Sequence, residues 1–321
     1  MKRICNLTLL LIALVLALSC EHKSVGSSSC SGETPNSIYH WKTTFDLDSA
    51  EVAFVQRHNI SRIYVKMFDV ATEHNFISGN YDPVPIATTK FVSAVPAGVE
   101  VVPVVYVTID ALRAMNGSES YYGEIIVERA MAMCNYNNLG EISQLQIDCD
   151  WTSSTKKSYD KLCTAAAKAL KSQGKQLSVT IRLHQLSESA PPADCGVLML
   201  YNTGALKSPK SRNSILDIAD AKPYLKQGSY PLPLAYAYPT FGWGVRFKDG
   251  EFEAIVSEDS TSDDKGVKIR TERPSAAEVL KVKALTESCY GKPANGNIIY
   301  HLDESQLKHY SDNEISQILA Y

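Results

Sequence analysis

The stretch QLQIDCDWTSSTKKSYDKLCTAAAKALKSQGKQLSVTIR, residues 144–182, contains the pattern that decides the fold. Its first part alternates polar and apolar residues, which predicts a strand over residues 142–151. A helix is predicted over residues 155–172, and Gly174 is placed to end it. A second strand is predicted over residues 176–186. A strand, a helix and a strand in this order are typical of a parallel sheet.

The same alternation extends over the rest of the chain from residue 38. Further strands are predicted over residues 38–43, 62–70, 100–108, 196–204, 232–241 and 296–302. Further helices are predicted over residues 48–58, 118–135, 214–225, 275–288 and 312–320, with a long polar loop and a short helix after residue 70. Eight such units predict an α/β fold, the closed (β/α)8 TIM barrel. VRFKDGEFEAIV, residues 245–256, predicts a small β-hairpin inserted after strand 7, turning at Asp249 and Gly250.

An open, doubly wound sheet is the competing architecture for alternating strands and helices. Such sheets usually carry a glycine-rich phosphate loop after the first strand. Here the first strand runs into IYHWKTTFD, residues 38–46, which contains no glycine. The closed barrel is therefore favoured, and no nucleotide cofactor is expected.

The N-terminal segment has the features of an export signal. Lys2 and Arg3 precede an apolar run that is too short to span a bilayer. The small residue before Cys20 indicates a lipoprotein signal over residues 1–19, with Cys20 lipidated. A secreted protein cut nearby is the alternative. The chain would then be exported and lipid-anchored to the outer membrane, on its periplasmic or cell-surface side. Residues 20–37 are predicted to be a flexible tether, and residues 38–321 a single domain.

Composition excludes some partners and leaves other questions open. The formal net charge is -3 and no run of lysine or arginine occurs, so nucleic acid is not an expected partner. The cysteines of the predicted mature chain have no CxxC or Cys/His spacing, which disfavours a zinc knuckle. An exported protein can form disulfides. Buried free thiols are the alternative, and spacing does not decide between them.

Polar and aromatic residues gather where the predicted strands end. In a TIM barrel the active site lies at the carboxyl ends of the strands. Asp148 and Asp150 are two residues apart, so they share one face of their strand. Carboxylates among tryptophans and tyrosines suit a sugar, because aromatic faces pack on pyranose rings. The candidate substrate-binding residues are His40, Trp41, Lys66, Tyr106, Trp151, Arg182, His184, Tyr201, Asn202, Tyr238, Trp243 and His301.

Several of these residues also have a purely structural interpretation. Asp148 and Arg182 could form an ion pair that fills the barrel, His184 could be a hydrogen-bonded core histidine, and Tyr201 could only pack. His40, His184, His301 and Asp303 are the candidate ligands of an alternative metal site. It is disfavoured because the first strand lacks the HxH pair that metal-dependent barrel hydrolases use.

Four strands resemble those of the chitinase-like barrels of glycoside hydrolase family 18. IDCDW, residues 147–151, resembles the DxxDxDxE signature, and MLYN, residues 199–202, resembles the M-x-Y-D strand. LPLAYAYPTFGWG, residues 232–244, and IIYHLDES, residues 298–305, resemble the family's seventh and eighth strands. The chain also looks like exported lipoproteins of glycan-degrading Gram-negative bacteria. The resemblance implies a TIM barrel that acts on a glycan.

The chain departs from that pattern at the residues that matter for catalysis. The family's acid is a glutamate two residues after the last aspartate, and Thr152 stands there. The first aspartate of the signature falls at Leu145, and the aspartate of the sixth strand at Asn202. Asp148 and Asp150 match the inner pair only. A substrate-assisted mechanism of the family's kind is therefore in doubt.

Two functions remain open. The favoured one is a glycoside hydrolase in which Asp148 and Asp150 work with a carboxylate from another strand, namely Asp303, Glu304 or Asp69. The other is a catalytically inactive, glycan-binding barrel of a polysaccharide-utilisation system. The missing glutamate supports binding, whereas the dense polar rim supports hydrolysis.

Overall fold

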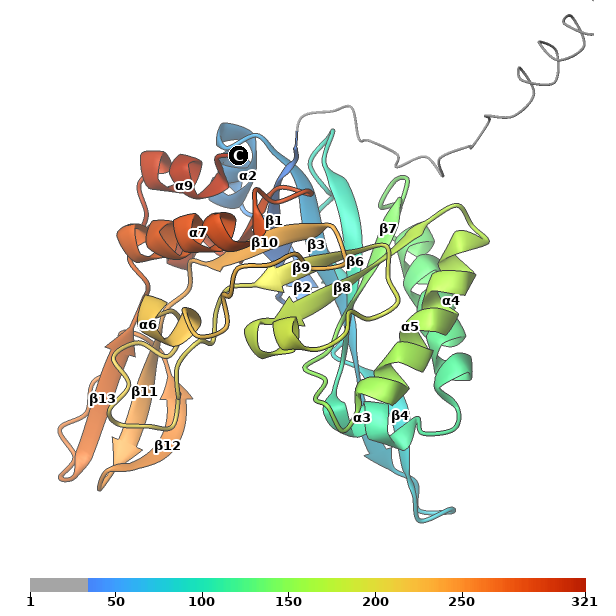
Figure 1. Cartoon of the computed structure of the whole chain (residues 1–321), viewed down its shortest axis with the longest axis horizontal. Helices are drawn as coiled ribbons and strands as arrows, with labels where there is room; N and C mark the ends of the chain where they lie inside the picture. Colours follow the sequence, from blue (N-terminus) through green and yellow to red (C-terminus); the bar gives the residue numbers. More distant parts are fainter. Residues whose placement is uncertain (1–33) are drawn as a thin grey trace, which may run out of the picture. The chain divides into compact units, whose positions relative to one another are not determined.

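The structure is a computed structural model that describes residues 34–321, which form one compact unit, Thr34–Tyr321 (Figure 1). The predicted signal over residues 1–19, the lipidation site Cys20 and all but the last residues of the predicted tether lie outside the described residues.

Eight parallel strands close into a barrel, as predicted. They follow the order β1-β14-β10-β9-β8-β7-β6-β3, and β1 pairs with both β14 and β3, which closes the ring. An open doubly wound sheet is excluded. The barrel strands are β1 (Asn36–His40), β3 (Ile60–His74), β6 (Glu100–Val107), β7 (Gln144–Asp148), β8 (Gln176–Arg182), β9 (Cys195–Met199), β10 (Leu234–Pro239) and β14 (Asn297–Tyr300).

Helices cover the barrel unevenly. In Figure 1, α4 and α5 lie together on one side, whereas α7, α9 and α2 lie on the other. Gly123 allows α4 and α5 to approach closely, because a Cβ there would lie 2.7 Å from the Leu162 carbonyl oxygen. No helix within residues 34–321 is long and apolar enough to cross a membrane. The helices are α2 (Ser49–Arg57), α3 (Ile109–Ala114), α4 (Glu119–Tyr136), α5 (Lys156–Lys171), α6 (Ile218–Ala221), α7 (Ala276–Tyr290), α8 (Glu304–Leu307) and α9 (Asp312–Leu319).

Two connections differ from the sequence prediction. After β3 the chain forms an antiparallel strand β4 (Tyr81–Ile86) and then β5 (Lys90–Phe91), which pairs with β2 (Thr44–Phe45). The prediction of a long loop and a short helix there was wrong. Prolines at positions 83 and 85 suit β4 because it is an edge strand. The helix predicted over residues 214–225 shortens to α6, which begins after its N-cap Asp217 and ends before Pro223, a residue without the backbone N–H that would continue the helix.

The insertion after β10 is a three-stranded antiparallel sheet rather than a hairpin alone. β11 (Trp243–Lys248) and β12 (Glu251–Val256) form the predicted hairpin. Its turn residues Asp249 and Gly250 both have positive φ, 50° and 90°, as a type I′ turn requires. β13 (Val267–Glu272) adds a third strand beside β11, which the sequence prediction missed. Figure 1 shows this sheet extending away from the barrel.

The barrel interior is packed in layers, and part of it is polar. Gln146 on β7 accepts a hydrogen bond from the Tyr39 hydroxyl at 2.7 Å, and both side chains are fully buried. Gln144, one layer below, donates to the Cys195 sulfur at 2.9 Å. The polar residues of QLQID are thus satisfied inside the barrel by side chains of other strands. They form the floor on which the residues of the mouth rest.

Candidate functional site

The layer above Gln146 is made of hydrogen-bonding side chains at the carboxyl ends of neighbouring strands. Asp69 on β3 pairs in register with Tyr106 on β6, and Tyr106 pairs with Asp148 on β7. The Thr180 hydroxyl on β8 donates to Asp148 Oδ1 at 2.5 Å. Paired residues of parallel strands point to the same side, so the two carboxylates, the phenol and the hydroxyl share the mouth of the barrel.

A β-bulge turns Asp69 into this layer. The register between β3 and β6 shifts between Lys66 and Phe68, which leaves Met67 as the extra residue. Without the shift Phe68 would pair with Tyr106 and face the mouth. With it, Phe68 is buried beneath the Arg129 guanidinium of α4, 5.1 Å from the ring centroid. Bulges re-aim side chains in this way next to functional sites.

Arg182 joins both aspartates of β7. Its Nη2 donates to Asp148 Oδ1 at 3.0 Å, and its Nε donates to Asp150 Oδ1. Its Nη1 donates to the Tyr201 hydroxyl at 3.3 Å. The Asp148 side chain is 3% exposed and that of Asp150 is 44% exposed. One guanidinium therefore holds a buried carboxylate and a carboxylate at the surface of the mouth.

Burial governs the protonation of this cluster. It raises the pKa of Asp148, while Arg182 and Thr180 act in the opposite direction. Burial also raises the pKa of Tyr106, and the nearby charges of Asp150 and Asp148 raise it further. Burial lowers the pKa of Arg182, but Asp148, Tyr201 and Asp150 outweigh this effect and raise it well above its usual value. The cluster therefore contains a permanent cation between two carboxyl groups and neutral phenols.

Aromatic rings form the wall opposite the carboxylates. The Tyr300 ring lies at the centre, with centroids 4.8 Å from Tyr201, 5.4 Å from Tyr39 and 5.7 Å from Trp41. Phe241 packs edge-on against Tyr300 at 5.8 Å. The sequence prediction included Trp41 and Tyr201 but missed Tyr300. Tyr300 lies two residues after Ile298 and therefore faces the same side of the strand. This spacing could have identified Tyr300 as a mouth residue from the sequence.

Lys66 links the aromatic wall to the carboxylate side. Its Nζ lies 5.8 Å from the centroid of the Trp41 ring and donates to Asp69 Oδ2 at 3.2 Å. The other oxygen of Asp69, Oδ1, is buried and has no hydrogen-bond partner in the structure. An unpaired buried carboxylate oxygen at a barrel mouth is a group that a ligand hydroxyl or amide could satisfy.

A cavity of about 280 Å³ lies at the mouth beside Arg182. The predicted residues Asp150, Arg182, His184, Tyr201 and Asn202 line it together. Leu183, Thr203 and Tyr224, which the sequence prediction did not include, complete the lining. The structure thus brings five of the predicted residues to one hollow at the carboxyl ends of β7, β8 and β9.

Two predicted aromatic residues have no face in the mouth, and a third lies at its edge. Trp151 is fully buried and stacks on Tyr159 of α5 at 5.9 Å, so its expected stacking on a sugar is wrong. Tyr238 is fully buried and lies under Lys283 of α7, outside the barrel wall. Trp243, in the inserted sheet, is partly exposed and packs on Phe241 of the aromatic wall, with ring centroids 5.2 Å apart. Its Nε1 donates to Glu272 Oε2 at 2.8 Å.

The histidines at the ends of β1 and β14 lie on different sides. His40 is 1% exposed, whereas its neighbours Tyr39 and Trp41 are among the mouth aromatics. Because side chains alternate along a strand, His40 faces away from the mouth, and its predicted contact with a ligand is wrong. His301 follows β14, is partly exposed, and its ring centroid lies 5.3 Å from that of Tyr300. It therefore remains a candidate for contact with a ligand.

Asp303 and Glu304 are placed outside the carboxylate layer. Asp303 is the N-cap of α8, accepts a hydrogen bond from the Ser305 backbone N–H at 3.0 Å and lies 3.7 Å from Lys42 Nζ. Glu304 lines a hollow between α2 and α8 on the outer side. Of the three partners predicted for Asp150, only Asp69 lies in the mouth layer. Within residues 34–321 no group of three His, Cys, Asp or Glu side chains could hold a metal ion.

Thr152 occupies an exposed turn after β7. Its hydroxyl is 2.9 Å from the Ser154 hydroxyl, and its backbone N–H donates to Thr155 Oγ1 at 3.0 Å. No carboxyl group stands at this position, and a threonine hydroxyl does not release a proton near neutral pH. The position where the resemblance places a general acid therefore supplies none.

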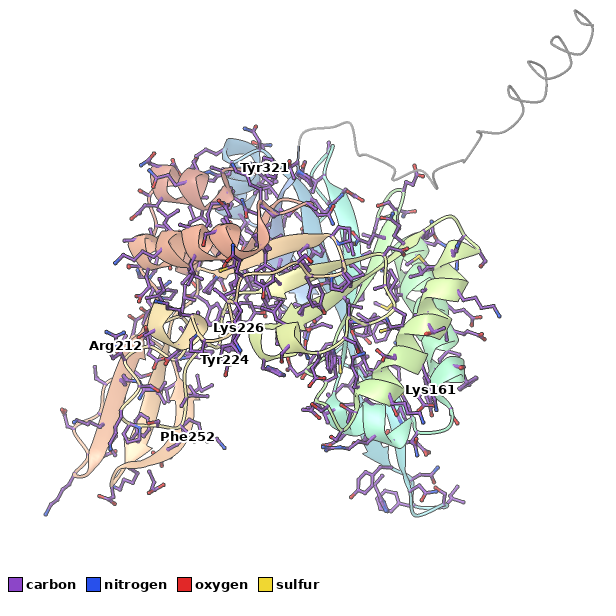
Figure 2. All side chains as sticks on the ribbon, viewed as in Figure 1. Lys161, Arg212, Tyr224, Lys226, Phe252 and Tyr321 are labelled. Atoms are coloured by element: carbon purple, nitrogen blue, oxygen red, sulfur yellow. The ribbon has the colours of Figure 1, made fainter. Side chains whose placement is uncertain are left out.

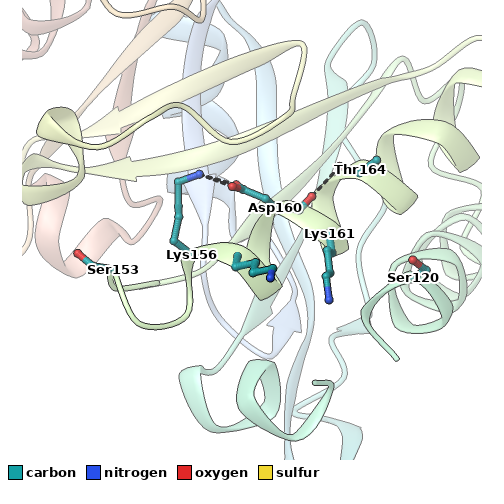
Figure 3. A pocket seen from close by; sticks show the side chains of 7 residues that line it. Ser120, Ser153, Lys156, Asp160, Lys161 and Thr164 are labelled. Atoms are coloured by element: carbon teal, nitrogen blue, oxygen red, sulfur yellow. Dashed lines mark hydrogen bonds and ion pairs between the residues drawn. The ribbon is translucent and has the colours of Figure 1, made fainter. Parts of the chain in front are cut away.

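A second hollow, of about 550 Å³, lies on the outer surface of α4 and α5 (Figure 3). Three lysines line it, but Lys156 is paired with Asp160 at 2.6 Å and Lys161 lies 3.6 Å from Glu119. Its residues come from helix surfaces rather than from strand ends. The mouth is therefore the stronger candidate for the functional site.

No protein-family profile and no curated protein matches the chain. Several solved structures, however, match its fold. The chitinase of Chromobacterium violaceum ATCC 12472 superposes with a TM-score of 0.55 at 12% identity, over 90% of this chain and 99% of that one. The fold is that of the chitinase-like TIM barrels. The spore cortex-lytic enzyme SleL of Bacillus cereus gives 0.53 at 12% identity, over 89% and 73% of the two chains.

A third structure was solved with a sugar. Catalytic domain 2 of the Ostrinia furnacalis group II chitinase, in complex with penta-N-acetylchitooctaose, gives a TM-score of 0.54 at 11% identity, over 88% of this chain and 95% of that one. At such identities the likeness concerns the fold. It agrees with the resemblance seen in the strand motifs.

Proposed function

We propose that this chain is a carbohydrate-binding barrel that holds an oligosaccharide of N-acetylhexosamine units at its mouth without cleaving it. The observation that carries the proposal is the Arg182 guanidinium, which holds both Asp148 and Asp150. The sugar class comes from the chitinases and the cortex-lytic enzyme that share the fold.

The mouth offers the contacts that a sugar needs. Trp41 and Tyr300 supply aromatic faces at one side, and both are only partly buried. Asp150 is 44% exposed and Asp69 has an unpaired buried oxygen, so the mouth also carries acceptors for hydroxyl or amide hydrogens. Few polar groups among apolar walls are the usual composition of a small-molecule site.

The same groups are poorly arranged for cleavage. Glycosidases need one carboxyl group that donates a proton and a second that attacks or activates water. Asp148 is buried beneath the mouth, Asp150 is bound by Arg182, and Thr152 replaces the expected acid. A sugar could bind while Arg182 remains bonded to both aspartates. Hydrolysis would require Arg182 to release Asp150.

Calorimetric titration with N-acetylchitooligosaccharides tests the binding. Wild-type protein is expected to bind, and Tyr300→Ala is expected to weaken binding about tenfold by removing the central ring. Tyr136→Ala is the matched control, because Tyr136 is 86% exposed at the end of α4, far from the mouth. Equal affinity of the two variants, or no binding by wild type to the chitin series or to peptidoglycan fragments, would overturn the proposal.

Hydrolysis is the second candidate, and one observation favours it. Burial raises the pKa of Asp148, and a carboxyl group with a raised pKa is the property of a catalytic acid. Asp69 lies in the same layer and would be the partner carboxylate. This function predicts released sugar that disappears in Asp69→Asn as well as in Asp150→Asn.

We also propose that the chain is exported and held on the outer membrane through a lipid on Cys20. The basic start, the short apolar run and the cysteine after a small residue support this. Metabolic labelling with palmitate in a Gram-negative host should label the wild-type chain and leave Cys20→Ser unlabelled. Label retained in that variant would place the lipid on another residue, and an unlabelled wild type would rule out the lipid anchor.

A further inference from the structure

One flank of the barrel lacks the long helix that usually covers it. The connection from β8 to β9 contains only a short 3₁₀ helix, η1 (Leu183–Ser187), before the chain returns at Cys195. The next connection contains α6, which has four residues. Neighbouring units are covered by the much longer α5 and α7. The wall between them is therefore lined by loops instead of a helix.

Another cavity, of about 300 Å³ and distinct from the hollow on α4 and α5, lies on this flank. It shares Leu183, His184 and Tyr224 with the mouth cavity, so the two hollows adjoin. Ligand sites in proteins usually measure about 300–1,000 Å³. The mouth cavity alone, at about 280 Å³, is at the lower limit. Together with the flank the site falls well within the range.

The lining of the flank cavity has the composition of a sugar groove. Tyr224 is 43% exposed, and Tyr290 at the end of α7 faces the same hollow. Leu186 and Pro223 add apolar surface, and the lining also contains His184, Ser187 and Lys226. Figure 2 shows Tyr224 and Lys226 close together on this side of the barrel. Aromatic rings with scattered hydrogen-bonding groups suit successive pyranose units.

We propose that the mouth and the flank cavity form one groove, in which further units of the bound oligosaccharide leave the mouth past His184 and Tyr224 and lie along η1. This inference rests on the proposed function and adds the direction of the chain and a preference for longer oligosaccharides. The shared lining residues carry it, because any ligand that extends from Asp150 past Tyr224 enters the flank cavity.

A blocking substitution on the flank tests the groove. Ser187 lines only the flank cavity, is exposed, and donates its hydroxyl hydrogen to the His184 carbonyl oxygen at 3.2 Å. Ser187→Trp would fill the hollow without changing a residue of the mouth. Ser172→Trp is the matched control, because Ser172 is also exposed and donates to a carbonyl three residues back, that of Ala169, at 2.8 Å.

The readout is calorimetric affinity for N-acetylchitooligosaccharides from the dimer to the hexamer. For the wild type and for Ser172→Trp, affinity should rise with length. For Ser187→Trp, the dimer should bind as in the wild type and the hexamer about tenfold more weakly. If the wild type binds the series and both variants show the same dependence of affinity on length as the wild type, the proposed groove is wrong. The proposed site at the mouth is then unaffected. If the wild type binds neither this series nor peptidoglycan fragments, the proposed function fails and the groove with it.

Discussion

The inner and outer faces of the strand ends differ sharply, although their residues are neighbours in sequence. On the inner face Tyr39, Trp41 and Tyr300 pack against one another around the mouth. On the outer face His40 is buried behind the wall, and its Nδ1 atom lacks a hydrogen-bond partner in the structure. One step along the chain separates a residue that can contact a ligand from one that cannot.

This difference shows that residue type alone does not identify a site residue in a barrel. Histidines, tryptophans and tyrosines stand on both faces, and each face uses them differently. Outward rings such as Trp151 and Tyr238 fill space against α5 and α7. Inward groups such as Asp148 and Arg182 satisfy one another's charge. Substitutions of the aromatic residues on the two faces should therefore separate stability from binding.

Removal of the Arg182 guanidinium should have the largest effect. Arg182→Met leaves Asp148 buried without its cation, which is expected to lower the free energy of unfolding by about 3–5 kcal/mol at neutral pH. Urea unfolding measures this. Arg182→Met combined with Asp148→Asn is the control, and it should recover most of the loss because the buried charge is gone. A loss below about 1 kcal/mol would mean that the pair is a surface-type ion pair.

Substitution of two tryptophans, one on each face, tests the difference between the faces. Trp151→Ala should lower the free energy of unfolding by about 3–5 kcal/mol, because it empties a fully buried site against Tyr159. Trp41→Ala should lower it less, because Trp41 is only partly buried, and should weaken oligosaccharide binding. Thermal unfolding and titration on the same samples check both. If Trp151→Ala folded stably and lost binding, the assignment of the faces would be reversed.

His40, on the outer face, is expected to have a smaller, pH-dependent effect on stability. Burial lowers the pKa of His40 to about 4, with Lys42 and His301 acting in the same direction. Between about pH 6.5 and 4 the unfolded chain binds a proton at His40 that the folded chain does not. Stability should therefore fall as pH falls through this window, by up to about 3 kcal/mol from this group.

Urea unfolding from pH 7 to pH 4 measures this dependence, with His40→Gln as the comparison. The variant should lose stability less steeply with falling pH, whatever its stability at pH 7. Parallel curves for the two proteins would show that His40 is protonated in the folded state and therefore reaches water.

The barrel could be predicted from sequence because its signal is repeated. Eight alternating units, with a strand–helix–strand pattern as clear as residues 144–182, leave little choice of fold. The third strand of the insertion and the β3–β4 hairpin were missed. β4 has prolines at alternate positions, and β13 is a short, mostly polar strand. Both are stabilised by pairing with a neighbour rather than by a pattern of their own.

The site was predictable only in part, because the side that each strand end faces depends on register. Asp150, Arg182, His184, Tyr201 and Asn202 meet as expected. Tyr238 was misplaced because the large residues of LAYAYP pack outward on α7 and the alanines face inward. The bulge at Met67, which brings Asp69 into the mouth, leaves no mark that a single sequence reveals. The hydrogen bond from Arg182 to Asp150 likewise could not be predicted from the sequence, because it depends on how the two strand ends lie in space.

The central claim is that the mouth binds a glycan and leaves it intact because Arg182 holds both aspartates and Thr152 supplies no acid. Mass spectrometry of the N-acetylchitohexaose recovered after prolonged incubation with saturating protein tests it most directly. The expected result is the intact hexamer alone, with wild type and Asp150→Asn indistinguishable. Shorter products from the wild type that disappear with Asp150→Asn would contradict it and establish a hydrolase.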